Sequence, residues 1–308
     1  MAACSDAATS GPERTFVLPN GTTVAVAPNG GVALSRDGRA LLATSDVAGI
    51  VARRFTESFR GQAAIWSFTR SGEETFPIGR LVSAAQEGDA VVVELDADGG
   101  AGRARVTVAP GEDAGATTRV HVEVAEIDGV GSIALPVRCD AEASFHAFGE
   151  QYHHTEAFRL LVTEQGIGRV PGLGEPQFFV NGDEHTTYFP MPYWLDARGW
   201  GALLGTSRRV DVDLCKADPA VAWLEVNGPE PVEVTVFHGP TTPDVIRQLG
   251  DVVGRPTAPP AWAYELWIAS QGGREKVLEE AAALRAADIP AGVLWVQDWT
   301  GIRRNLDG

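Results

Sequence analysis

Three dipeptides that favour tight turns lie within the first forty residues of this chain. They are Asn20-Gly21, Asn29-Gly30 and Asp37-Gly38, and each separates short runs of apolar or alternating apolar and polar residues. Asn-Gly and Asp-Gly are preferred at the centre of two-residue β-hairpin loops, because both central positions require a positive φ angle. This segment therefore predicts consecutive hairpins.

The pattern of short strands continues to about Val236. Further runs typical of strands are AIWSF, AVVVELD, RARVTVA, RVHVEVAEI, GSIALPVR and PVEVTVFHG. Many short strands with few helical stretches are characteristic of an antiparallel sandwich. The sequence therefore predicts a mainly β fold, with an N-terminal antiparallel β-sandwich over residues 1–241.

The pattern changes at residue 242. A short helix over 242–253 and the proline-rich run RPTAPPAW predict a connector over residues 242–260. A strand, a helix and a second strand are then expected within residues 261–308, and such a unit pairs its strands in parallel. The predicted helix carries its apolar residues at a spacing of three and four, at Val277, Leu278, Ala281, Leu284 and Ala287.

A parallel strand pair is normally buried on both faces by further elements. An eight-stranded α/β barrel takes ~250 residues, and the run AGVLWVQDW of the second strand lies close to Gly308. Unless the sandwich or another chain covers this strand pair, we therefore expect residues 261–308 to open a larger α/β domain that is truncated here. Its open strand edges predict poor solubility or aggregation of the isolated chain.

Charge and hydropathy exclude two classes of partner. The formal net charge is −16 and the pI is about 4.8, which disfavours binding to a nucleic-acid backbone. The longest apolar runs are the length of strands, far short of the ~20 residues of a membrane-spanning helix. We expect neither nucleic acid nor a membrane as partner.

The cysteines and the N-terminal residues bear on location. Cys4, Cys139 and Cys215 are odd in number and widely spaced, which matches neither a disulfide framework nor a zinc signature. We expect free thiols that serve as small apolar residues. The first residues show no basic region followed by an apolar core, so no secretory signal is expected. Together these features predict a cytoplasmic protein.

Three stretches carry further information: FGEQYHHTEAFRLLVTEQGIGRVPG, LWIASQGG and LWVQDWTGIR. Together they resemble glycoside hydrolase family 31, and within it the sulfoquinovosidase branch. They occur in the order expected for that branch, with TYFPMPYWLDARGWGALLGTS between the first two. The resemblance extends over most of the chain and is weaker before about residue 140.

The resemblance implies a galactose-mutarotase-like sandwich followed by a catalytic (β/α)8 barrel, of which residues 261–308 are the incomplete start. It also implies retaining hydrolysis of α-glycosides of sulfoquinovose, such as sulfoquinovosyl glycerol, with no metal or organic cofactor. The family's two catalytic aspartates lie on later barrel strands, beyond Gly308, and so do its sulfonate-binding residues. We therefore expect the 308-residue chain itself to be inactive as a hydrolase.

Four residues after the predicted barrel strands are candidates for substrate binding: Gln271, Gln297, Asp298 and Trp299. Barrel enzymes place their sites at the carboxyl ends of the strands. Ordinary α-glucosidases of the family carry an acidic residue where Gln297 aligns. A carboxylate there would repel a sulfonate, whereas an amide can donate a hydrogen bond to it.

Each of these candidates also has a structural interpretation. Asp298 follows Gln297, so its side chain points to the other face of a regular strand and is equally suited to capping a turn. Gln271 precedes Gly272-Gly273 and serves equally to end a strand. Trp295 and Trp299 are capable of stacking on a sugar ring, although buried packing is commoner for tryptophan.

A loop of the sandwich supplies a second set of candidates: Glu150, Gln151, Glu164 and Arg169. Their charged members either reach the sugar site or pair with one another to hold the loop. His146, His153, His154 and His185 lie in the same region, but their spacing matches no zinc pattern, so no metal site is expected.

Two other functions remain open from the sequence. One is a carbohydrate-binding or scaffold sandwich that does not turn over its ligand. The other is an ordinary α-glucosidase of the same family, which an acidic residue at position 297 would have favoured.

Overall fold

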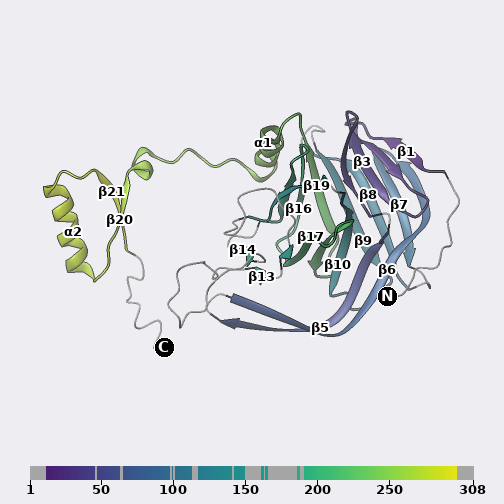
Figure 1. The fold of residues 1–308 in the computed structure, drawn as a ribbon, viewed down its shortest axis with the longest axis horizontal. Helices are drawn as coiled ribbons and strands as arrows, with labels where there is room; N and C mark the ends of the chain where they lie inside the picture. Colours follow the sequence, from purple (N-terminus) through teal and green to yellow (C-terminus); the bar gives the residue numbers. More distant parts are fainter. Residues whose placement is uncertain are drawn as a thin grey trace. The chain divides into compact units, whose positions relative to one another are not determined.

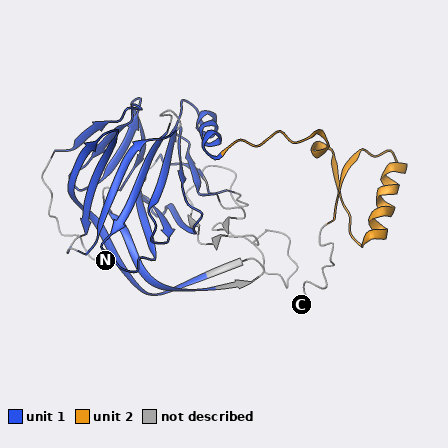
Figure 2. Cartoon of the chain, turned by 180° about the vertical axis from the view of Figure 1, so that it is seen from behind, with its two compact units in different colours: residues 1–253 blue, residues 254–308 orange. Residues whose placement is uncertain are grey.

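The structure is a computed structural model that describes residues 12–45, 47–62, 65–97, 99, 101–112, 117–140, 142–149, 161, 162, 164, 165, 186, 187 and 191–296. The chain forms two compact units, Met1–Val253 and Gly254–Gly308 (Figure 2). We refer to them as the first and second units. Across the described ranges, no helix has both the length and the apolar character to cross a membrane.

The first unit is built from antiparallel sheets, as the sequence predicts (Figure 1). A four-stranded sheet has the order β1-β2-β3-β4, and a thirteen-stranded sheet has the order β11-β15-β16-β19-β9-β8-β7-β6-β5-β10-β18-β17-β12. Buried side chains from both sheets form one hydrophobic core, because strands such as β2 and β8 alternate buried and more exposed residues. The prediction of a mainly β fold is confirmed.

The strands of the four-stranded sheet are β1 (Arg14–Val17), β2 (Thr23–Val26), β3 (Val32–Arg36) and β4 (Arg39–Ala43). Those of the large sheet are β5 (Ile50–Gln62), β6 (Ile65–Glu87), β7 (Ala90–Ala97), β8 (Arg103–Pro110), β9 (Thr118–Ala125), β10 (Ser132–Arg138), β11 (Phe145–Ala147), β12 (Leu161–Val162), β15 (Tyr193–Asp196), β16 (Trp200–Leu204), β17 (Val210–Asp218), β18 (Val221–Asn227) and β19 (Val232–His238). A separate parallel pair consists of β13 (Glu164–Gln165) and β14 (Thr186–Thr187).

The predicted hairpin turns connect the strands of the four-stranded sheet. Gly21 and Gly30 have φ angles of +84° and +83°. Asp37 and Gly38 both have positive φ, +50° and +74°, as a two-residue type I′ turn requires. The third turn consequently sets Arg36 of β3 directly opposite Arg39 of β4.

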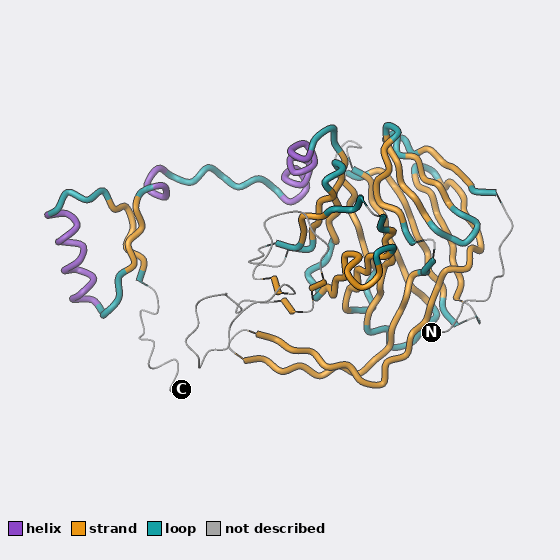
Figure 3. Tube along the Cα trace, in the orientation of Figure 1, coloured by secondary structure: helices purple, strands orange, loops and turns teal. Residues whose placement is uncertain are grey.

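Strands β5 and β6 are much longer than the short strands that the sequence predicts, at 13 and 23 residues. Beyond Arg54 on β5, this hairpin pairs only with itself among the described residues (Figure 3). Arg70 on β6 ties it to the sheet, because its guanidinium donates to Glu225 of β18 at 2.6 Å and to Asp211 of β17 at 2.9 Å. An isolated two-stranded hairpin is marginally stable, so these contacts support it.

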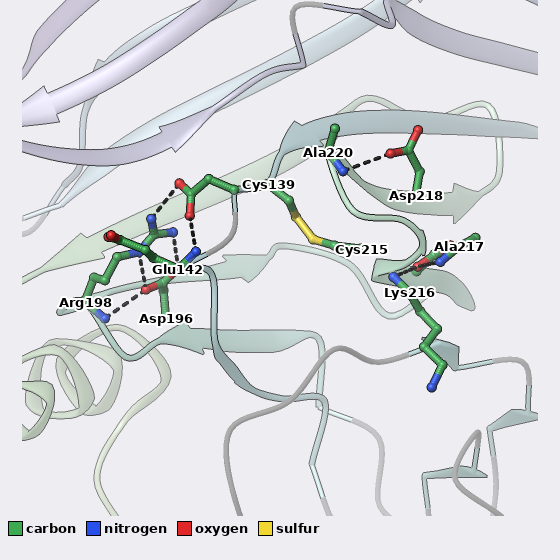
Figure 4. The surroundings of a disulfide bond; sticks show 11 residues. Cys139, Glu142, Asp196, Arg198, Cys215, Lys216, Ala217, Asp218 and Ala220 are labelled. Carbon is green, nitrogen blue, oxygen red and sulfur yellow. Dashed lines mark hydrogen bonds and ion pairs between the residues drawn. A yellow bond between two sulfur atoms is a disulfide. The ribbon is translucent and has the colours of Figure 1, made fainter.

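A disulfide joins Cys139, which follows β10, to Cys215 on β17 (Figure 4). Their Cα atoms are 6.3 Å apart, within the usual range for a disulfide, and both residues are buried. The expectation of free thiols is therefore wrong for these two cysteines, because the fold brings together residues 76 positions apart. Cys4 lies outside the described residues. The predicted cytoplasmic location stays a prediction and loses this support.

The turn between β15 and β16 is held by a buried carboxylate (Figure 4). Asp196 is fully buried and accepts hydrogen bonds from the backbone N–H and Nε of Arg198, both at 2.8 Å, and from its Nη2 at 2.6 Å. Arg198 Nη1 also donates to Asp140 Oδ2 at 2.7 Å. The hydrogen bonds to Asp196 are the main cause that raises the pKa of Arg198, and this guanidinium is therefore a permanently charged link between two chain segments.

Helix α1 (Thr242–Val253) closes the first unit and confirms the predicted helix. Val245 and Leu249 are buried on one side of it, against Leu195 of β15 and Phe237 of β19. The spacing of four residues places both side chains on the same face of the helix. This helix therefore packs on the sandwich and belongs to the same compact unit.

The second unit has the predicted strand-helix-strand order. Its elements are a 3₁₀ turn (Ala261–Tyr264), β20 (Leu266–Ala269), α2 (Arg274–Ala286) and β21 (Ala291–Trp295). The two strands pair in parallel, as expected. Seven of its large apolar side chains are between 42% and 76% exposed: Trp262, Tyr264, Leu266, Trp267, Leu278, Ile289 and Trp295.

Candidate functional site

The candidate site lies at the carboxyl ends of β20 and β21. Because the strands are parallel, both ends meet at one edge of the two-stranded sheet. Ala269 pairs with Trp295, and the N–H of Ser270 donates to the carbonyl of Trp295 at 3.0 Å. Gln271 is the first residue past this hydrogen bond, and it is exposed.

A glycine turn sets the position of Gln271 between β20 and α2. Gly272 and Gly273 have φ angles of +107° and +88°, which residues with a Cβ atom rarely adopt. A Cβ atom on Gly272 would also lie 3.3 Å from Cβ of Lys276. The chain therefore reverses immediately after Gln271 and enters α2 at Arg274, so that the amide is left at the strand end.

Ser270 connects this edge of the two-stranded sheet to helix α2. It is 2% exposed, and its hydroxyl donates a hydrogen bond to Glu280 Oε2 on α2. The other oxygen of Glu280 lies 3.7 Å from Nζ of Lys276, which also pairs with Glu279 at 3.3 Å. The serine thus ties the helix to the strand end, and the chain around Gln271 is held at both sides.

The sequence reasoning did not identify Ser270 or Glu280. Their link joins positions ten residues apart across a strand, a glycine turn and a helix, and no local pattern marks it. The predicted apolar face of α2 is in part confirmed, because Val277, Ala281 and Leu284 are partly buried while Leu278 and Ala287 are exposed. None of the α2 side chains is buried in this unit.

The structure describes only some of the predicted site residues. Gln271 is described at the strand end, and Glu164 is described only as the partner of Thr186 in the β13–β14 pair. Gln297, Asp298, Trp299, Glu150, Gln151 and Arg169 lie outside the described residues. Trp295 is 55% exposed within the second unit, so buried packing is not its observed state there.

The four clustered histidines bear on whether the chain has a metal site. Of the four clustered histidines, His146 alone is described. Within the described ranges, no group of three His, Cys, Asp or Glu side chains is arranged to hold a metal ion.

The strand ends of the second unit present groups that can bind a polar ligand. The Gln271 amide offers both a donor and an acceptor, which suits hydroxyl groups. Exposed Trp295 at the end of β21 adds an aromatic surface of the kind on which a sugar ring can pack. The Ser270–Glu280 link holds the edge in place, as a binding site requires.

Comparisons with known proteins agree with this architecture. No family model matches the chain. Among curated proteins, the chain is 26% identical over 187 residues to a sulfoquinovosidase of Agrobacterium fabrum and 24% identical over 195 residues to one of Escherichia coli. These matches cover 56% and 57% of this chain and 27% of each relative, so the chain spans about a quarter of their length.

Solved structures give the same result at the level of fold. A GH31 family sulfoquinovosidase from E. rectale, in complex with an aza-sugar inhibitor, matches with a TM-score of 0.73 at 18% identity, covering 90% of this chain and 41% of that one. A cycloalternan-forming enzyme from Listeria monocytogenes matches with a TM-score of 0.55 at 13% identity, covering 94% and 36%. By sequence and by fold, the chain therefore resembles part of a glycoside hydrolase family 31 enzyme of the sulfoquinovosidase kind.

Proposed function

We propose that this chain is part of a retaining α-glycosidase that hydrolyses α-glycosides of sulfoquinovose. The observation that carries the proposal is the sequence similarity to two sulfoquinovosidases over more than half of the chain. The fold of the first unit, followed by a parallel strand-helix-strand, is consistent with a sandwich that precedes a catalytic barrel.

Retaining hydrolysis uses two carboxyl groups ~5 to 5.5 Å apart that flank the anomeric carbon. In this proposal both belong to later barrel strands, after Gly308. The 308-residue chain then contributes groups that position the sugar, and it has no hydrolytic activity alone.

Substrate selection in this proposal rests on two amides at the ends of the first barrel strands. Gln271 binds sugar hydroxyls, and Gln297, two residues after the end of β21, lies close to the anionic substituent. Asp298 and Trp299, together with the sandwich-loop residues Glu150, Gln151, Glu164 and Arg169, stay predictions as further substrate contacts. An uncharged amide at position 297 avoids the repulsion that a carboxylate would exert on a sulfonate in a site of low dielectric constant.

The test compares two substrates and one charge change. The protein purified from its source should hydrolyse nitrophenyl α-sulfoquinovoside with a higher kcat/KM than nitrophenyl α-glucoside. Gln297→Glu should lower kcat/KM for the sulfoquinovoside at least tenfold and affect the glucoside much less, because only the first substrate carries a sulfonate.

Gln86→Glu is the matched control, since it makes the same chemical change at an exposed position near the end of β6. It should leave both substrates unaffected. The proposal fails if the native protein hydrolyses only the glucoside, or if Gln297→Glu lowers both activities equally.

A second candidate function is carbohydrate binding without turnover, favoured by the compactness of the first unit as an independent body. In that case calorimetry would detect binding of sulfoquinovosyl glycerol by the chain, while the native protein would show no hydrolysis.

A related substrate class is also tested in the hydrolysis assay, because the chain is 23% identical over 194 residues to an α-xylosidase of Lactiplantibacillus pentosus. Nitrophenyl α-xyloside is therefore included as a third substrate.

A further inference from the structure

A pocket lies on the first unit, and no residue of the second unit lines it. Its volume is about 470 Å³, within the usual range for small-molecule sites. Its walls come from the β3–β4 turn, the β15–β16 turn, the end of β19 and helix α1. Every residue that lines it belongs to residues 36–248, so the pocket is complete within one compact unit.

Arginine is concentrated in this pocket. Arg36, Arg39 and Arg198 line it, together with Asp37 as its one acidic lining residue. The charge of Arg198 is already paired with Asp196 and Asp140. Arg36 and Arg39 are therefore the residues that favour an anion. The whole chain, by contrast, has 25 basic and 41 acidic residues and a formal net charge of −16. A pocket with this composition within an acidic protein favours an anionic occupant.

The two arginines of the β3–β4 turn are direct cross-strand partners. Arg36 pairs with Arg39 across the Asp37-Gly38 turn, which places their side chains on the same face of the hairpin. Like charges in this arrangement repel each other. Arg39 Nη1 donates to the carbonyl of Gly239 at 3.2 Å, which directs this guanidinium to the pocket wall at the end of β19.

His238, at the end of β19, also lines the pocket and carries a polar atom that needs a partner. Its Nε2 is buried and finds no hydrogen-bond partner among the described residues. Its backbone is fixed on both sides by Gln248 of α1, which accepts from the N–H at 3.3 Å and donates to the carbonyl at 2.7 Å. Buried polar atoms are almost always paired, so an unpaired one at a pocket wall indicates a missing partner.

The charged groups of the β3–β4 turn also influence the pKa of His238. Burial is the main cause that lowers the pKa of His238, and the charges of Arg36 and Arg39 lower it further, while Asp37 opposes them. The ring is therefore neutral at pH 7. A neutral imidazole presents Nε2 either as a donor or as an acceptor to a hydroxyl group.

We propose that this pocket binds a small organic molecule that carries an oxyanion, with Arg36 and Arg39 on the oxyanion and His238 Nε2 on a hydroxyl group. Trp200, the cross-strand partner of His238, provides an aromatic wall beside it. A sugar phosphate has both features, and free inorganic phosphate has the first alone. The site is independent of the proposed hydrolase site, because it uses no residue of the second unit.

The test is calorimetric titration of the protein with glucose 6-phosphate, inorganic phosphate and glucose at low ionic strength, where screening is weak. The proposal expects glucose 6-phosphate to bind. It also expects Arg36→Gln and Arg39→Gln each to weaken that binding at least tenfold, since each removes charge-assisted hydrogen bonds. Arg103→Gln, an exposed arginine on β8, is the matched control and should bind as the native protein does.

A rise in unfolding temperature with glucose 6-phosphate gives a second readout, and it should disappear in Arg36→Gln. Equal affinity for inorganic phosphate would identify the oxyanion alone as the ligand, and tighter binding of glucose 6-phosphate would identify the sugar phosphate. Three results would overturn the proposal: no binding of either phosphate, equal binding of glucose and glucose 6-phosphate, or an effect of Arg103→Gln equal to that of the pocket variants. None of these results depends on hydrolase activity.

Discussion

The disulfide between Cys139 and Cys215 gives the most quantitative prediction for stability. It closes a loop across a sequence separation of 76 residues, which includes strands β11 to β16. In the chain-entropy model, a cross-link of that length lowers the entropy of the unfolded chain by an amount worth roughly 4.5 kcal/mol at 25 °C. Measured effects are often smaller, so we expect a loss of about 2 to 4.5 kcal/mol when the link is removed.

The perturbation is alanine substitution of Cys139, of Cys215 and of both, followed by urea unfolding of each variant. Either single change breaks the whole cross-link. The two single variants and the double variant should therefore lose nearly the same free energy of unfolding. Two buried thiols without a bond would instead give losses that add, because each would contribute its own packing.

Two further measurements belong to the same experiment. Thiol titration of the unfolded, unreduced protein should find one free thiol among three cysteines, and Cys4→Ala should leave none. The slope of the free energy against urea concentration should rise when the link is removed, because the unfolded chain then exposes more surface. Three free thiols, or additive losses from the two single variants, would refute the reasoning.

Three other predictions concern buried polar groups of the first unit. Asp196→Ala should lower the free energy of unfolding by roughly 2 to 3 kcal/mol, because it removes a fully buried carboxylate that accepts three hydrogen bonds from Arg198. A loss below about 1 kcal/mol in urea unfolding would contradict this. Tyr193→Phe should raise the free energy of unfolding by about 1 kcal/mol, because the buried hydroxyl loses its hydration on folding and has no hydrogen-bond partner among the described residues. A clear loss of stability would show that this hydroxyl is bonded. His238 has a lowered pKa in the folded state, so the unfolded chain binds more protons below pH 6.5, and stability falls as the pH falls from that value through the folded-state pKa. His238→Gln should flatten that part of the profile of stability against pH, and an unchanged profile would contradict this.

The hairpins and the parallel strand pair were predictable because their signals are local. Asp37-Gly38 satisfies the backbone demands of a type I′ turn by residue type alone. The helix at 242–253 and the strand-helix-strand that follows the proline-rich run show equally clear changes of periodicity. In these segments, the residues that determine the structure are neighbours in the chain.

Strand β6 was not predictable in the same way. It continues through Gly72, Pro77 and Gly79, residues that normally end or weaken a strand. Register shifts near these residues, where β6 pairs with β5 and β7, absorb the irregular positions. Such bulges depend on the neighbouring strands, so the sequence of β6 alone indicates breaks where the sheet is continuous.

The remaining errors and omissions share one physical cause. The Cys139–Cys215 disulfide and the Arg198–Asp140 pair each join segments more than fifty residues apart, and neither spacing carries a signal. The His238 pocket likewise combines turns from distant parts of the chain. For the sugar site, the sequence predicted Gln271 at a strand end, where the structure has it, whereas the role of Gln297 stays a prediction.

The most direct test of the proposed function is the ratio of kcat/KM for nitrophenyl α-sulfoquinovoside to that for nitrophenyl α-glucoside, measured with the protein purified from its source. The account predicts a ratio well above one, and no turnover of either substrate by the 308-residue chain alone. A ratio below one for the native protein, or hydrolysis of the sulfoquinovoside by the 308-residue chain, would contradict it.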